Sequence, residues 1–251
     1  MAHFYLVEEL ASSTVGSDVV VTGPEARHAV TVSRVRPGES LRVGNGRGLV
    51  VEGEVREATG DRLVLVAETV TVHPRPARRL VLVQALAKGD RDELAVQAAT
   101  ELGVDEVVPW AAGRSISRWE GPKVAKGIAR WQAIVREATK QSIRAYQPEV
   151  SGVASTADLV RRAASATVLV LEPTADAALS SVEIDSTGDV EIDSTGDVLI
   201  VVGPEGGITP HELEQFRAAG AMAVRLGDSV LRTSTAGPAA LAVLSTRLGR
   251  W

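Results

Sequence analysis

The sequence contains no cysteine. This absence excludes disulfide bonds, thiolate nucleophiles, and zinc or iron–sulfur centres with cysteine ligands. Aromatic residues make up only 3% of the 251 residues, whereas 45% are hydrophobic, so the core must consist largely of Val, Leu and Ala. With 24% charged residues, the composition is typical of a globular protein long enough for one large domain or two smaller ones.

Long hydrophobic runs are also missing. No apolar stretch approaches the roughly 20 residues that a membrane-spanning helix requires. The N-terminus lacks the charged segment and long apolar core of a secretory signal. We therefore expect a cytoplasmic protein with no membrane partner. The four histidines, His3, His28, His73 and His211, show no ligand spacing, so we expect no metal site.

Positive charge is scarce in total but locally concentrated. The net charge of −5 argues against a nucleic acid partner, yet residues 114–144 contain eight Lys or Arg and two acidic residues. Residues 151–231 contain thirteen acidic residues and four basic ones. A polyanion responds to the local patch rather than to the total charge. The basic segment is therefore either a nucleic acid contact or the solvated face of a helix, and the charges alone leave both open.

The first 73 residues have the pattern of a small β domain. Short runs rich in Val and Leu are separated by Gly, Asn and Asp turns, and GNGRG at 44–48 is typical of a hairpin. One helical insert is expected within 23–35. The segment HPRPARR at 73–79 contains two prolines and three arginines, and we place an interdomain linker at 74–79.

From residue 80 onward, strand patterns alternate with helix patterns, which predicts an α/β domain with a largely parallel sheet. A helix after Asp90 is expected to begin with a capping box between Asp90 and Glu93 and to stop at Gly103. Another is expected over 123–144, and the last from about Pro238. On the helix over 123–144, apolar residues share one face, and basic residues project from roughly the opposite face: Lys126, Arg130, Lys140 and Arg144.

One stretch, VEIDSTGD, occurs twice in tandem, at 182–189 and 190–197. Because loop closure entropy grows slowly with length, we expect it to form a lengthened surface loop. An acidic metal-binding loop is the alternative, although the spacing does not match an EF-hand.

The stretch LIVVGPEGGITPHE at 199–212 predicts a strand, a tight glycine turn and a helix. Thr209 is a candidate N-cap, Pro210 suits the first helical position, and Glu212 completes a capping box. No Lys-Ser/Thr follows the glycines and GxGxxG is absent, so the loop is neither a Walker A loop nor a dinucleotide fingerprint.

In open α/β sheets, ligands bind beyond the carboxyl ends of the strands, and this loop lies there. Two further strand-end loops, after Leu171 and after Leu226, occupy matching positions. The three loops either converge on one pocket, or the glycines form a tight turn without a ligand.

Read together, VVGPEGGITPHE and VRLGDSVLRTSTA resemble the C-terminal signature of the SPOUT class of RNA methyltransferases, most closely the 16S ribosomal RNA uracil N3-methyltransferase family. Three upstream blocks agree in the right order, so the resemblance covers nearly the whole chain: HAVTVSRVRPGESLRVGNGRG, QALAKGDRDELAVQAATELGVDEVVPWAAGRS and RWQAIVREATKQSIRAYQPEV.

The resemblance implies a PUA-like RNA-binding β-barrel over 1–73 and a SPOUT α/β domain over 80–251, with a trefoil knot over about 171–240. Such a knot is a rare exception to the rule that chains do not thread loops. The resemblance also implies a homodimer. The implied reaction is methylation of N3 of a uridine in 16S ribosomal RNA of the small ribosomal subunit, with S-adenosylmethionine as methyl donor.

By the same resemblance, the methyl donor sits in the knot and is held mainly by backbone groups. The implied cofactor-binding residues come from the three strand-end loops: Leu171, Glu172, Val202, Gly203, Gly206, Gly207, Leu226, Gly227, Leu231 and Ser234. Two positions depart from the family pattern. Ser234 stands where the family usually has Glu, and Ala98 where it often has Lys.

Three residues are candidates for the chemistry. Methyl transfer requires mainly positioning, but N3 of uracil must lose a proton, and a cation near O2 or O4 would stabilise the resulting anion. Arg232 is the candidate cation; a phosphate or dimer-interface contact is its alternative. Glu205 is a candidate proton acceptor or, alternatively, orders the loop or faces the cofactor. Arg114 is a candidate to orient the base or a flanking phosphate.

Basic side chains that contact the RNA backbone would give affinity without reading sequence. The basic candidates are Arg34, Arg36, Arg114, Arg118, Arg136, Lys140 and Arg144, and the neutral Gln141 is a further candidate that alternatively caps a helix turn. Three other functions remain open: a non-catalytic RNA-binding module, a SPOUT methyltransferase with a different RNA target, and a nucleotide-binding α/β enzyme. The missing Walker lysine and GxGxxG argue against the last.

Overall fold

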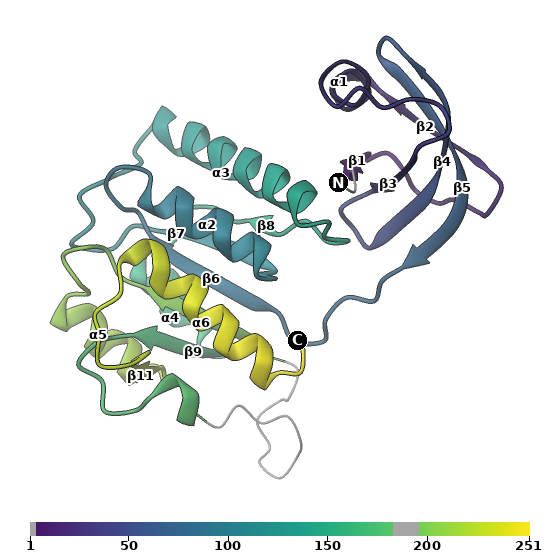
Figure 1. Cartoon of the computed structure of the whole chain (residues 1–251). Helices are drawn as coiled ribbons and strands as arrows, with labels where there is room; N and C mark the ends of the chain where they lie inside the picture. The colour runs from purple at the N-terminus through teal and green to yellow at the C-terminus, as the bar shows by residue number, and fades with distance from the viewer. Residues whose placement is uncertain (1–3, 183–195) are drawn as a thin grey trace. The chain divides into compact units, whose positions relative to one another are not determined.

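The computed structural model describes residues 4–182 and 196–251, so the duplicated VEIDSTGD segment lies almost entirely outside the described residues. The chain divides into two compact units (Figure 1). The first contains the residues up to Arg75 together with Thr139–Gln147, and the second contains Pro76–Ala138 and Pro148–Trp251. The sequence pattern did not anticipate that residues from the later half of the chain complete the first unit.

The first unit is built on a curled, mixed five-stranded sheet with the order β1-β3-β4-β5-β2 (Figure 1). Its strands are β1 (Phe4–Leu6), β2 (Asp18–Thr22), β3 (Ser40–Gly44), β4 (Leu49–Thr59) and β5 (Arg62–Val72). Strand β1 pairs parallel to β3, and the other neighbours are antiparallel. The pairing of β3 with β4 confirms the hairpin predicted at GNGRG. Two register shifts between β4 and β5 are sites where these long strands bend.

The predicted helical insert is a short helix, α1 (Gly23–Arg27), followed by a π-helical turn, η1 (His28–Val32). Ala26 and Ala29 of this insert are fully buried against the inner face of the sheet. The all-β reading of this region and its single helical interruption are therefore confirmed, and together they give the PUA-like fold.

Residues 139–147 are attached to the first unit by polar contacts. The Lys140 ammonium lies 3.2 Å from a carboxylate oxygen of Glu25, and the two side chains are only 12% and 14% exposed. The Tyr146 hydroxyl donates to the carbonyl of His73 at 2.8 Å. Lys140, which we expected on the face opposite the apolar one and as an RNA contact, has an enclosed side chain that is paired with Glu25.

The second unit contains a six-stranded sheet with the order β11-β9-β10-β6-β7-β8, and every recorded pairing in it is parallel. The strands are β6 (Leu80–Ala85), β7 (Glu106–Trp110), β8 (Glu149–Val150), β9 (Ala166–Leu171), β10 (Asp197–Val202) and β11 (Met222–Val224). The predicted α/β domain with a parallel sheet is therefore confirmed. The trefoil knot over about 171–240 stays a prediction.

Helices cover both faces of this sheet (Figure 1). They are α2 (Arg91–Glu101), α3 (Pro122–Gln141), α4 (Thr156–Arg162), α5 (Pro210–Ala218) and α6 (Thr233–Arg247), with a short 3-10 turn, η2 (Leu179–Ser181). Leu80 and Leu82 of β6 pack in the core formed with α2, α3 and α6, whereas Val81 and Val83 face α4 and α5. Because both faces of β6 are buried, its sequence is a nearly continuous run of apolar residues.

Two predictions of how helices begin are wrong. Asp90 is the N-cap of α2, but its backbone is left-handed at φ 58° and its side chain makes no capping bond. Glu93 instead accepts from Arg130 at 2.9 Å. Helix α6 begins at Thr233 rather than near Pro238, which lies inside the helix. Pro238 cannot donate a helical hydrogen bond, but this costs one bond only, and the buried Thr233 fixes the start of the helix.

Among residues 4–182 and 196–251, no helix is both long and apolar enough to cross a membrane. The same described residues contain no group of three or more His, Cys, Asp or Glu side chains placed to bind a metal ion.

Candidate active site

Three loops at the carboxyl ends of β9, β10 and β11 enclose a pocket of about 400 Å³ in the second unit. This is within the range of sites for small molecules. Its walls are mostly apolar, with charged side chains from the same loops and one from the start of α2. The lining residues are Arg91, Leu171, Glu172, Pro173, Val202, Gly203, Pro204, Glu205, Gly207, Ile208, Val224, Arg225, Leu226, Gly227, Ser229, Val230, Leu231, Arg232, Thr233 and Ala236.

Most of the residues expected to hold a cofactor lie in this lining. Eight of the ten do so: Leu171, Glu172, Val202, Gly203, Gly207, Leu226, Gly227 and Leu231. Gly206 and Ser234 are not in it. Ser234 lies half-buried on the first turn of α6, one residue after Thr233, which does line the pocket. The structure thus gathers the three predicted loops around one cavity.

The glycine loop has the compact form that its sequence predicts. Gly207 has φ +74°, a left-handed conformation that favours glycine, and a Cβ on Gly203 would lie 2.7 Å from the Ile208 side chain. The loop leads directly into α5, where the predicted capping box is present: the amide of Glu212 donates to the Thr209 hydroxyl at 3.2 Å, and the amide of Thr209 donates to the Glu212 carboxylate at 3.0 Å.

A buried polar chain fastens this loop to the start of α6. The Thr233 hydroxyl donates to the carbonyl of Gly203 at 2.9 Å and accepts from the side-chain amide of Gln84 at 2.8 Å. Gln84, at the end of β6, is fully buried. Gln84 was not among the predicted site residues, although a glutamine inside the apolar run LVLVQAL was a signal in the sequence, since a buried amide requires partners.

Glu205 is held by the segment that precedes α2. Its carboxylate accepts from the Arg91 guanidinium at 2.9 Å and from the Lys88 amide at 3.2 Å. Burial alone would raise the pKa of Glu205, but the hydrogen bonds from backbone amides and from Arg91, with the Arg91 charge, lower it below the ordinary glutamate value. A low pKa makes a weak proton acceptor, so these contacts favour the loop-ordering role of Glu205 over the role of a base.

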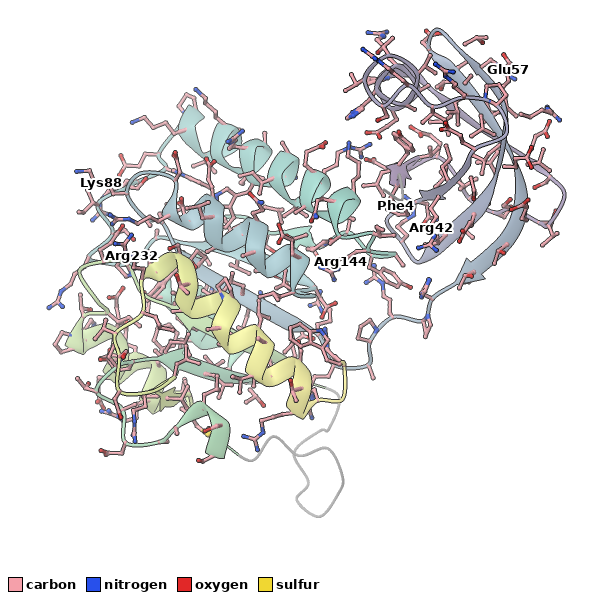
Figure 2. The ribbon with its side chains drawn as sticks, in the orientation of Figure 1. Phe4, Arg42, Glu57, Lys88, Arg144 and Arg232 are labelled. Atoms are coloured by element: carbon pink, nitrogen blue, oxygen red, sulfur yellow. The ribbon has the colours of Figure 1, made fainter. Side chains whose placement is uncertain are left out.

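Arg114 does not line the pocket but touches the glycine loop from outside it. Its guanidinium donates to the carbonyl of Gly206 at 3.0 Å. Arg232, by contrast, lines the pocket and is the N-cap residue of α6. Figure 2 labels Arg232 at the N-terminal end of this helix. No acceptor is recorded for its guanidinium within 4–182 and 196–251, and the side chain is exposed.

The candidate RNA-contacting residues differ in accessibility. Arg34 and Arg36 in the first unit are exposed, as are Arg118 and Gln141. Arg136 and Arg144 are half-buried. Lys140 is enclosed with Glu25, so it is a poorer candidate for a phosphate contact than the exposed residues.

Comparison with protein families gives two matches along the chain. Residues 73–245 match the family model described as an RNA methyltransferase domain. Residues 21–68 match a model described as an RNA methyltransferase PUA domain. The first match covers more than half of the chain and includes the pocket loops and the helices on both sides of the parallel sheet.

Curated relatives extend along the full chain. The chain is 43% identical, over 258 aligned positions, to ribosomal RNA small subunit methyltransferase E of Mycobacterium bovis, covering 100% of this chain and 94% of the relative. It is 30% identical to the protein of the same name from Bacillus subtilis, covering 90% of this chain and 88% of the relative.

Solved structures with the same architecture include complexes with a cofactor. Ribosomal RNA small subunit methyltransferase E from Neisseria gonorrhoeae, bound to S-adenosyl methionine, superposes with a TM-score of 0.84 at 29% identity and 98% coverage of both chains. A putative methyltransferase from Legionella pneumophila in complex with the same cofactor superposes with a TM-score of 0.83 at 25% identity, again with 98% coverage of both chains.

Proposed function

The chain belongs to the family of ribosomal RNA small subunit methyltransferase E, and from this membership we propose that it methylates N3 of a uridine in 16S ribosomal RNA. The methyl donor is S-adenosylmethionine, which supplies an electrophilic methyl group when bound. The observation that carries the proposal is the pocket formed by the three strand-end loops, because the loops that resemble the methyltransferase signature also enclose it.

The pocket fits this cofactor in size and chemistry. Its apolar walls include Val202, Ile208 and Leu226, which suit the adenine ring and the methionine chain. The glycine loop presents bare backbone on one side, which allows hydrogen bonding by main-chain groups rather than side chains. The cofactor would be held by the predicted residues that line the pocket, and Gly206 and Ser234 would act through their neighbours Gly207 and Thr233.

Arg232 is the residue that we propose to act on the base. Its guanidinium borders the pocket and makes no recorded hydrogen bond or ion pair within the described part of the chain. An unengaged cation at this place is available to stabilise negative charge on uracil as N3 loses its proton. We do not assign the proton to Glu205, whose pKa is lowered by its partners.

We further propose that exposed cations bind the RNA backbone without reading its sequence. In the first unit these are Arg34 and Arg36, and in the second unit Arg118 is exposed close in sequence to Arg114. Because the proposed substrate is the small ribosomal subunit, the compartment that we propose is the cytoplasm. A homodimer is also proposed, since Val230 and Leu231 at the pocket are 76% and 38% exposed and suit an apolar contact.

The proposed function is tested by methyl transfer to small ribosomal subunits from a strain that lacks the modification. Purified protein is incubated with these particles and labelled S-adenosylmethionine, and the RNA is digested and examined by mass spectrometry. We expect label in N3-methyluridine at one site in 16S RNA.

Each other outcome points to a different function. Label in another nucleotide or another RNA would indicate a methyltransferase with a different target. Binding of RNA without binding of S-adenosylmethionine in calorimetry would indicate a non-catalytic RNA-binding module, and the proposal would then be rejected.

A further inference from the structure

Glu212, on the first turn of α5, uses both carboxylate oxygens. One oxygen, Oε2, accepts from the amide of Thr209 at 3.0 Å and from its hydroxyl at 2.7 Å, which is the local capping box. The other oxygen, Oε1, accepts from the amide of Gly113 at 2.8 Å and from the hydroxyl of Thr156 at 3.0 Å. A helix cap requires only the first oxygen, so the second serves a different purpose.

The second oxygen fixes the loop that follows β7. Trp110, the last residue of β7, is fully buried, and its indole NH donates to the Thr156 hydroxyl at 3.2 Å. Phe216, one helical turn after Glu212, packs edge-to-face on Trp110 with ring centroids 5.7 Å apart. Side chains at i and i+4 lie on one face of a helix, so α5 holds the end of β7 with Phe216 and the following loop with Glu212.

The loop held in this way carries Arg114. Gly113 donates its amide to Glu212, and the next residue, Arg114, donates its guanidinium to the carbonyl of Gly206 in the glycine loop. The contacts therefore close a ring: the glycine loop leads into α5, Glu212 of α5 holds Gly113, and Arg114 returns to the glycine loop. A shift of the Gly113 amide would move Arg114 relative to the cofactor pocket.

The carboxylate is suited to this task because it remains charged. Glu212 is only 6% exposed. Burial alone would raise the pKa of Glu212, but the hydrogen bonds from Gly113, Thr209 and Thr156 lower it below the ordinary value. A charged carboxylate is a pure acceptor and can satisfy all four donors, whereas a protonated one cannot.

We propose that Glu212 is a positioning residue for methyl transfer, acting by fixing the Arg114 loop against the glycine loop. This inference rests on the proposed function, because its readout is methyl transfer. It adds to that function a residue that lies outside the lining of the pocket and acts through Arg114.

The test compares two substitutions on the same helix, Glu212→Gln and Glu214→Gln. In Glu212→Gln, the new side-chain amide places an NH2 group opposite a donor whichever way it is turned, whereas Glu214 is exposed and pairs with Arg217 at 3.2 Å. At 20 °C, with the folding of each variant checked by circular dichroism, we expect Glu212→Gln to lower kcat at least tenfold, with the Kd for S-adenosylmethionine changed less than threefold. For Glu214→Gln, both kcat and the Kd for S-adenosylmethionine should stay within twofold of the wild-type values.

Two further variants separate positioning from helix capping. Thr209→Val removes the capping hydroxyl but leaves the Gly113 contact, so it should lower the thermal midpoint without lowering kcat. The effects of Glu212→Gln and Arg114→Ala on kcat should be much less than multiplicative in the double variant. An unchanged kcat in Glu212→Gln, or fully multiplicative effects, would overturn the inference. Lack of methyl transfer by the wild type would instead reject the proposed function.

Discussion

Arg232 illustrates how the environment of a single residue decides what it can do. The arginines around the pocket differ in their partners: Arg91 is paired with Glu205, and Arg225 donates to the carbonyl of Ala175 at 2.9 Å. The guanidinium of Arg232 makes no hydrogen bond or ion pair with residues 4–182 or 196–251. A guanidinium already committed to a carboxylate or a carbonyl has little capacity to stabilise new negative charge, so Arg232 is the stronger candidate for the developing uracil anion.

At this scale we predict that Arg232→Ala lowers kcat by about 100-fold, which is typical for removal of one donor that stabilises an anion in a transition state. The Kd for S-adenosylmethionine should change little, because backbone groups hold most of the cofactor. Methyl-transfer assays measure the change in kcat, and calorimetry measures the Kd for S-adenosylmethionine. Arg217→Ala is the matched control, since Arg217 is exposed on α5 and pairs with Glu214. A loss confined to the KM for RNA would identify Arg232 as a phosphate contact instead.

The end of α3 shows strain in an element whose sequence looks regular. The amides of Ile143 and Arg144 donate to the carbonyls of Lys140 and Thr139, at 3.2 and 3.1 Å, which is a Schellman ending. Ile143 takes the left-handed position with φ +55°, which glycine normally occupies. A β-branched side chain is strained there by about 1–2 kcal/mol. The predicted helix over 123–144 therefore ends at Gln141, three residues early.

We predict that Ile143→Gly changes the free energy of unfolding by less than about 0.5 kcal/mol, because relief of the left-handed strain offsets the lost side-chain contacts and the added backbone entropy. The same substitution at Ile134, a half-buried residue within α3, should cost at least about 2 kcal/mol. Urea unfolding of both variants measures the difference. If the two substitutions lowered the free energy of unfolding equally, the backbone of Ile143 would not be strained.

At the scale of the whole molecule, the two compact units have separate cores: the first unit has one, and the second has one on each face of its sheet. All the residues that line the pocket belong to the second unit. A ligand that binds only the folded pocket stabilises the unit that contains it. The cofactor should therefore stabilise the second unit and leave the intrinsic stability of the first unit unchanged.

We predict that S-adenosylmethionine at about 100 times its Kd stabilises the second unit by about 2.7 kcal/mol, which raises its unfolding midpoint by roughly 5–10 °C. Scanning calorimetry of the full chain measures this shift. ATP with Mg²⁺ is the control and should give no shift, since the glycine loop lacks a Walker lysine. An equal shift of both units would contradict independent unfolding, and no shift with S-adenosylmethionine would contradict the assigned pocket.

Much of the fold was predictable from local pattern. The alternation of apolar runs and helices predicts a parallel α/β sheet, and the GNGRG turn predicts the β3–β4 hairpin, because both depend on residues close in sequence. The capping box of Thr209 and Glu212 was predictable for the same reason. The capping box at Asp90 was not formed, since Glu93 found a partner, Arg130, 37 residues away. Local signals thus fail where a distant group competes for the same side chain.

What the sequence determined by itself is the identity of the strands and most helices, the glycine turn, and the family signature that places a methyl donor beside it. The partners of the polar side chains, by contrast, depend on the folded structure. Gln84 meets Thr233 across 149 residues, and Glu212 meets Gly113 across 99. Lys140 is enclosed with Glu25, across 115 residues. Burial makes these pairings obligatory, because a buried polar group needs a partner, but only the folded chain brings that partner within reach.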